Sequence, residues 1–132
     1  MDSPKSSLSA GAIVRALLLD IPLVRERGVR VFPVFQPSEK AILPYIDYRR
    51  ASLVATPAKG VARTPDTIEL VLNCYTARYA EGVELAEAVR AALDCRSASA
   101  DGLTMRACHL SDSAEDYQAD AYIQQLTFTI RI

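Results

Sequence analysis

Apolar residues recur along this chain with two periods, and each period predicts a type of secondary structure. Near the N-terminus a spacing of three and four residues predicts a helix with Ser9 as its N-cap, ending at Asp20-Ile21-Pro22. One more helical turn is expected before Gly28, which acts as a stop. The clearest helix is predicted over Tyr79 to Asp94, and its apolar stripe consists of Gly82, Ala86, Val89 and Leu93, with Leu85 and Ala92 beside it.

Alternation of apolar and polar residues, together with β-rich runs, predicts five strands. They cover Val29 to Phe35, Tyr45 to Val54, Thr67 to Tyr75, Leu103 to Leu110 and Ala121 to Ile132. The first should be short or lie at a sheet edge, because Pro33 cannot donate to a ladder. Arg96 to Gly102 is expected to be a polar turn, and Ala55 to Asp66 a loop too long for a tight hairpin. The order of elements predicts an α+β fold, with a mainly antiparallel sheet of about five strands and two α-helices packed on it.

Composition indicates a globular chain and limits its partners. Of the 132 residues, 50% are hydrophobic and 23% charged, so we expect a single domain over residues 1–132, with residues 1–7 flexible. Fifteen Lys and Arg residues against sixteen Asp and Glu residues give a net charge of −1, which provides no general reason to expect nucleic-acid or membrane binding. The apolar run from Ala10 to Leu19 contains Arg15, so it predicts neither a membrane span nor a secretory signal.

Three cysteines and one histidine are the candidate reactive groups. Cys74, Cys95 and Cys108 are odd in number and form no CxxC pair, which indicates reduced thiols without a structural metal. Cys108 adjoins His109, but neighbouring residues of a strand point to opposite faces and cannot act as nucleophile and base. We therefore expect no catalytic residue, no cofactor and no metal ion. A small Cys-dependent cytosolic enzyme that uses Cys108 or Cys74 with His109 stays open as an alternative.

Two charged clusters also require interpretation. The acidic cluster consists of Asp112, Glu115, Asp116 and Asp120. It lacks the ligand spacing and central glycine of an EF-hand, so it is interpreted as a solvated loop. Arg49-Arg50 stands beside Tyr45 and Tyr48 and could form a nucleic-acid patch, but alternation splits these residues between two faces. From the residues alone, the chain is a globular α+β domain suited to a structural or interaction role.

The order of several local patterns resembles a family of phage proteins. The patterns are Val29-Arg30-Val31-Phe32-Pro33, Leu43-Pro44-Tyr45-Ile46-Asp47-Tyr48, the strand Leu70 to Thr76 leading into the helix Tyr79 to Leu93, Asp116-Tyr117, and the strand Leu126 to Ile130. Over residues 8 to 132 this succession resembles the tail completion proteins of long-tailed bacteriophages, also called tail terminators or head-tail joining proteins. The proline-rich loop from Ala55 to Asp66 departs from the family pattern.

The resemblance implies a structural role in the virion. Such proteins form a ring, usually of six subunits, at the head-proximal end of the tail tube, where the ring ends tube growth and joins the tail to the head. The implied partners are further copies of the chain, the tail tube protein and the head–tail connector, with genomic DNA passing through the lumen without specific binding. Assembly would take place in the host cytoplasm. A different neck or connector component is a second alternative. Partner contacts are expected at Lys59, Arg63, Arg49 and Arg50.

Overall fold

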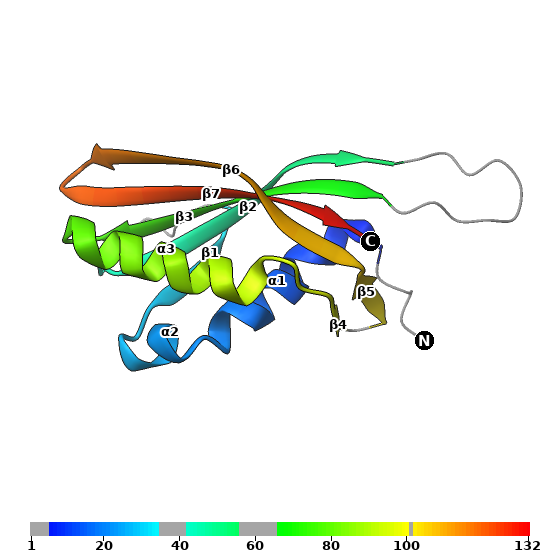
Figure 1. Cartoon of the computed structure of the whole chain (residues 1–132), viewed down its shortest axis with the longest axis horizontal. Helices are drawn as coiled ribbons and strands as arrows, with labels where there is room; N and C mark the ends of the chain where they lie inside the picture. The colour runs from blue at the N-terminus through cyan, green and yellow to red at the C-terminus, as the bar shows by residue number, and fades with distance from the viewer. Residues whose placement is uncertain (1–5, 35–41, 56–65, 101) are drawn as a thin grey trace, which may run out of the picture.

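A computed structural model describes residues 6–34, 42–55, 66–100 and 102–132 of the chain. In chain order its elements are η1 (Ser7–Ser9), α1 (Ala10–Leu19), α2 (Pro22–Glu26), β1 (Arg30–Pro33), β2 (Tyr45–Val54), β3 (Thr67–Thr76), α3 (Tyr79–Leu93), β4 (Ala98–Ala100), β5 (Leu103–Met105), β6 (Ala107–Gln118) and β7 (Ala121–Arg131). Within these ranges five strands form a sheet in the order β1-β2-β3-β7-β6, and β4 pairs with β5 alone. The three α-helices lie on one side of the large sheet (Figure 1), so the predicted α+β class is confirmed.

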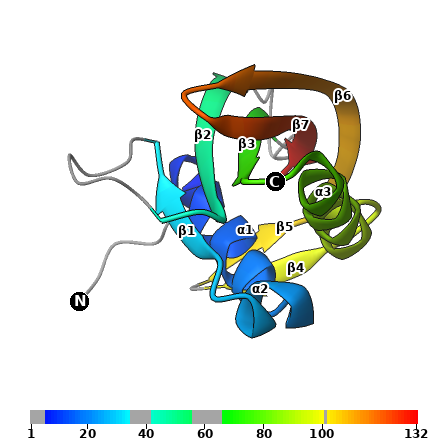
Figure 2. The same cartoon turned by 90° about the vertical axis from the view of Figure 1, so that its left-hand side faces the viewer.

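The large sheet is mixed. β1 runs parallel to β2, with Val31 opposite Ile46, whereas the β2–β3, β3–β7 and β7–β6 pairings are antiparallel. The mainly antiparallel sheet predicted from the sequence is therefore confirmed, with one parallel edge. β1 is short and lies at that edge, as Pro33 predicts. The sheet curls around the helices when it is seen along its strands (Figure 2).

The core lies between the concave side of the sheet and α1 and α3. Alternate residues of β3 are at most 1% exposed: Ile68, Leu70, Leu72 and Cys74. They form one apolar cluster with Phe128 and Ile130 of β7 and with the buried stripe of α3. Gly82 belongs to that stripe, and a Cβ there would lie 2.8 Å from Thr76 Oγ1. Glycine therefore lets the first turn of α3 lie directly against the end of β3.

Two predictions for the segment after α3 were wrong. The turn expected at Arg96 to Gly102 contains β4, which pairs with β5 so that Ala98 lies opposite the buried Met105. The single strand expected at Leu103 to Leu110 is divided between β5 and the first residues of β6. Three-residue strands are too short to show a hydrophobic period, so only tertiary pairing reveals them.

The acidic cluster is a strand and a turn, not a solvated loop. Asp112, Glu115 and Asp116 belong to β6, which pairs with β7 as far as Gln118 opposite Ala121. Ala119 and Asp120 connect the two strands with positive φ angles of 50° and 62°. The segment is polar and exposed, yet it is extended because β7 offers backbone partners along its whole length.

Some sequence predictions concern residues outside the described part. Most of the loop expected over Ala55 to Asp66, including Lys59 and Arg63, lies there. Of the flexible start expected at residues 1–7, the structure describes Ser6 and Ser7. Ser7 is buried, and its hydroxyl donates to Asp66 Oδ2 at 2.6 Å. None of the described helices is long and apolar enough to cross a membrane.

Candidate interaction surface

The face of the sheet opposite the helices carries a row of hydrogen-bonded polar side chains. Asn73 Nδ2 donates to Asp47 Oδ1 at 2.9 Å, and Gln125 Nε2 donates to Asn73 Oδ1 at 3.1 Å. The row therefore crosses β2, β3 and β7. Tyr75 donates its hydroxyl to Asp47 Oδ2 at 2.8 Å, and its ring stacks on Tyr45 with centroids 4.4 Å apart. Burial and the bond to Asp47 raise the pKa of Tyr75, so it stays a donor.

This polar row borders a shallow depression that continues onto the last two strands. The depression has a volume of about 360 Å³. Its lining consists of Asn73, Tyr75, Ala114, Glu115, Asp116, Gln118, Ile123 and Gln125. Polar groups fixed by neighbours lose little freedom when a partner binds them, so this face is a preorganised platform.

A second polar surface lies where the β6–β7 hairpin passes the first turn of α3. Tyr122 contacts Tyr79 and Tyr117, with ring centroids 5.9 Å and 4.8 Å apart. Glu115 Oε2 accepts hydrogen bonds from Tyr79 Oη at 2.8 Å and from Gln124 Nε2 at 2.9 Å. The bonds from Gln124 and Tyr79 lower the pKa of Glu115, so it is charged at neutral pH. Tyr79 and Tyr117 are about half exposed, at 49% and 54%.

We call this surface the hairpin patch. It consists of Tyr79, Glu115, Tyr117, Asp120 and Tyr122, whereas Asp116 lies on the opposite face of β6, among the residues that line the depression. The acidic members were noticed in the sequence, but the tyrosines were not assigned to a site. The available signal was the excess of six tyrosines over three phenylalanines, which favours amphipathic contacts without saying where they gather.

The two arginines predicted as partner contacts lie on different faces, as strand alternation predicts. Arg50 pairs opposite the buried Leu70, and its Nη1 donates to the Leu8 carbonyl at 2.9 Å. Arg49 pairs opposite Val71 and is exposed on the face that carries the polar row. They therefore do not form one basic patch.

The cysteines and the histidine do not form a reactive pair. Cys108 is 1% exposed and faces the core, whereas its neighbour His109 is exposed. Burial raises the pKa of Cys74 and of Cys108 to about 12, so both stay protonated thiols. No group of three or more metal-ligating side chains occurs in the described ranges. The pair of cysteine thiol and histidine base that the enzyme alternative requires is therefore not formed by these residues.

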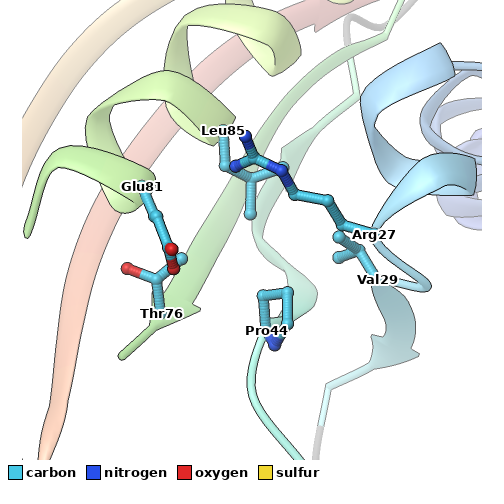
Figure 3. A pocket seen from close by; sticks show the side chains of 6 residues that line it. All are labelled: Arg27, Val29, Pro44, Thr76, Glu81 and Leu85. Carbon is cyan, nitrogen blue, oxygen red and sulfur yellow. The ribbon is translucent and has the colours of Figure 1, made fainter. Parts of the chain in front are cut away.

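The helical side has pockets whose polar groups serve the fold. One, of about 260 Å³, is lined by Arg27, Val29, Pro44, Thr76, Glu81 and Leu85 (Figure 3). Arg27 forms an ion pair with Glu84 at 2.9 Å, and the Thr76 hydroxyl donates to the Arg78 carbonyl at 2.8 Å. Its lining residues come from the ends of neighbouring elements, so the pocket lies at the seam between α2, β1, β3 and α3.

The family model described as "Tail completion protein gp17" matches residues 8–132. The chain belongs to the tail completion protein gp17 family. The resemblance inferred from the sequence is therefore confirmed over nearly the whole chain. Tail completion proteins are structural proteins of the phage virion tail and are not enzymes.

The same fold occurs among solved structures. A chain in the structure entitled "Virion of native gene transfer agent (GTA) particle" superposes with a TM-score of 0.75. The two chains are 22% identical, and the match covers 96% of this tail completion protein and 98% of the other chain. At that identity the likeness establishes a shared fold. No curated protein matches the sequence.

Proposed function

We propose that this tail completion protein is a tail terminator. Six copies form a ring at the head-proximal end of the tail tube, where the ring ends tube growth and joins the tail to the connector of the head. Membership of the family supports this role, and so does the fold shared with a chain of a gene transfer agent particle. DNA passes through the ring lumen without specific binding, in keeping with the net charge of −1.

The observation that carries the proposal is the difference between the two edges of the sheet. The β1 edge is four residues long and includes Pro33, which cannot donate to a further strand. The β6 edge is twelve residues long, and residues 111–120 are all exposed. Long open edges are sites where another chain adds. The two sides of the subunit therefore differ, as a ring requires, because its contacts join unlike surfaces of neighbouring copies.

The partners above and below the ring are the tail tube protein and the head connector. Arg49 lies on the exposed face of the sheet, and Lys59 and Arg63 supply further positive charge to the segment between β2 and β3. We assign these three side chains, and also Arg50 on the other face of β2, to partner contacts. Their charge would be attracted to acidic surfaces of those partners.

Electron microscopy of assembled particles tests the proposal. Antibody or gold labelling of this chain should mark the junction between tail and head, and particles lacking the chain should separate into free heads and free tails. Native mass spectrometry of the purified protein should show a multiple of 14.4 kDa, with six copies expected. A label elsewhere in the neck would favour the alternative of a different connector component. A chain that is monomeric and absent from the junction would overturn the proposal.

The segment between β2 and β3 offers a second, narrower test. Replacing residues 57–65 with a short Gly-Ser turn should leave the subunit folded but reduce the fraction of joined particles. The matched control is the double variant Lys59→Glu and Arg63→Glu, which keeps the length and reverses the charge. Normal joining with both variants would show that this segment contacts no partner.

A further inference from the structure

Charged side chains are segregated along the length of the β6–β7 hairpin. Its closed end carries Glu115, Asp116 and Asp120, without a lysine or arginine between Asp112 and Gln118. Its open end carries Arg106 and Arg131, which are exposed and adjacent because the Arg106 amide donates to the Arg131 carbonyl at 2.8 Å. One hairpin therefore has an acidic end and a basic end.

Among the described residues, the charged groups of the two ends form no ion pair within the subunit. The ion pairs among the described residues are Arg25–Asp20, Arg27–Glu84 and Arg90–Asp94. None of them uses the carboxylates of the hairpin patch or the arginines at the open end. Isolated surface charges of this kind contribute little to the stability of a subunit, but they determine which surfaces associate.

We infer that the hairpin patch of one copy binds the Arg106 and Arg131 end of the hairpin of a neighbouring copy. This inference rests on the proposed ring and assigns the surfaces that meet within it. The contact joins unlike ends, so it is heterologous and repeats in one direction until the ring closes. A two-fold contact between like ends would instead place carboxylates against carboxylates.

The tyrosines make the acidic end a specific receptor for arginine. Tyr79 and Tyr117 expose about half of their surface, and a guanidinium stacks favourably on such ring faces. Both hydrogen bonds to Glu115 end on Oε2, which leaves Oε1 to accept from an arginine. Exposed tyrosines opposite arginines are the residue types that dominate binding energy at protein interfaces.

The test uses charge reversal at each end and then mixes the variants. Glu115→Lys places a positive charge in the hairpin patch, and Arg131→Glu places a negative charge at the open end. Each variant alone should need at least about tenfold more protein than the wild type to assemble, measured by sedimentation velocity and native mass spectrometry. Glu87→Lys is the matched control, because Glu87 is an exposed α3 residue outside both surfaces and should assemble as the wild type does.

Mixing the two variants in equal amounts should restore assembly. An alternating ring then has two kinds of contact: the new lysine against the new glutamate, and the unchanged acidic end against the unchanged basic end. Circular dichroism of each variant checks folding. If a reversal variant fails to fold, Glu115→Gln and Arg131→Gln replace it, and each should weaken assembly without rescue on mixing.

The other outcomes separate this inference from the proposed ring. Rings that form with Glu115→Lys alone and with Arg131→Glu alone as readily as with the wild type overturn the inference and leave the proposed ring intact. Assembly of Glu115→Lys with wild type as readily as with Arg131→Glu would show contact between like ends, which also overturns it. A wild type that is monomeric in solution and absent from the tail–head junction removes the proposed function, and the inference with it.

Discussion

The two faces of the same sheet are built by different forces. On the helical face Leu72 is fully buried, while on the opposite face its neighbour Asn73 is held by hydrogen bonds to Asp47 and Gln125. Apolar burial contributes roughly 25 cal/mol per Å² removed from water, whereas one hydrogen bond contributes about 0.5–1.5 kcal/mol net. Burial on the helical face therefore supplies most of the stability of the subunit. The hydrogen-bonded polar face contributes less to stability and remains exposed to partners.

Truncating the covered face should have the largest effect. Leu93 of α3 is fully buried in the core, so Leu93→Ala removes apolar contacts and leaves a cavity. We expect the free energy of unfolding to fall by about 2–5 kcal/mol, measured by urea denaturation. Ile123→Ala on the half-buried opposite face is the control and should cost less than half as much. A loss below about 0.5 kcal/mol for Leu93→Ala would contradict its place in the core.

Filling the space at Gly82 should have the next largest effect. An added Cβ would lie 2.8 Å from Thr76 Oγ1, which is buried and bonded to the Arg78 carbonyl, so the helix must move away from the sheet. Overpacking costs about 1–3 kcal/mol, and the better helix propensity of alanine returns about 1 kcal/mol. We expect Gly82→Ala to lower the melting temperature.

A double-variant cycle isolates the cause. Thr76→Ala removes the atom that the new Cβ would meet, so Gly82→Ala with Thr76→Ala should lose less stability than the two single variants added together. Ala80→Gly, at an exposed position of the same helical turn, reports the propensity contribution alone. Strict additivity would show that the close approach of α3 to β3 is not the reason for this glycine.

Breaking the polar row should have a smaller effect. Asn73→Ala removes the hydrogen bonds to Asp47 and Gln125, while Asp47 keeps the hydroxyl of Tyr75. We expect a loss of about 1–2 kcal/mol in the free energy of unfolding. Thr129→Ala, on the same face but outside the row, should change stability by less than about 0.5 kcal/mol. Equal losses for both variants would mean that the row adds nothing to the sheet.

The smallest effect concerns the protonation of Glu115. Hydrogen bonds from Gln124 and Tyr79 lower its pKa in the folded protein, so its stabilising contribution is present above its unfolded pKa and is lost as the pH falls through the folded value. Tyr79→Phe should shift the pKa of Glu115 upward, as carboxyl NMR titration would show. Tyr45→Phe, three strands away across the sheet, should leave it unchanged. An unshifted Glu115 in Tyr79→Phe would contradict the hydrogen bond.

The sequence predicted the elements whose apolar residues are periodic. The alternation in β3 and the stripe on α3 are visible residue by residue, because the core faces one side of each element. The polar half of β6 shows no period, since neither of its faces is buried there and only pairing with β7 makes it a strand. The parallel direction of β1 could not be predicted either, because apolar and polar residues alternate in the same way in parallel and antiparallel strands.

The candidate surface was less predictable than the fold. Its acidic residues are neighbours in sequence and were noticed as a cluster. Tyr117 and Tyr122 meet because they are directly opposite in the hairpin, and Tyr79 joins them from the start of α3. Such a meeting depends on strand register and helix placement, which local patterns do not contain.

The position of β7 also determines when the protein can fold. β7 is the last strand in chain order, yet it lies in the interior of the sheet between β3 and β6, and Thr67 pairs with Arg131. Pairing across so many residues closes a long loop, which slows folding. On the ribosome, the apolar side of β3 stays without its neighbour until β7 has been synthesised. The subunit therefore folds late and as a whole, and before that point its unpaired strands are exposed to aggregation.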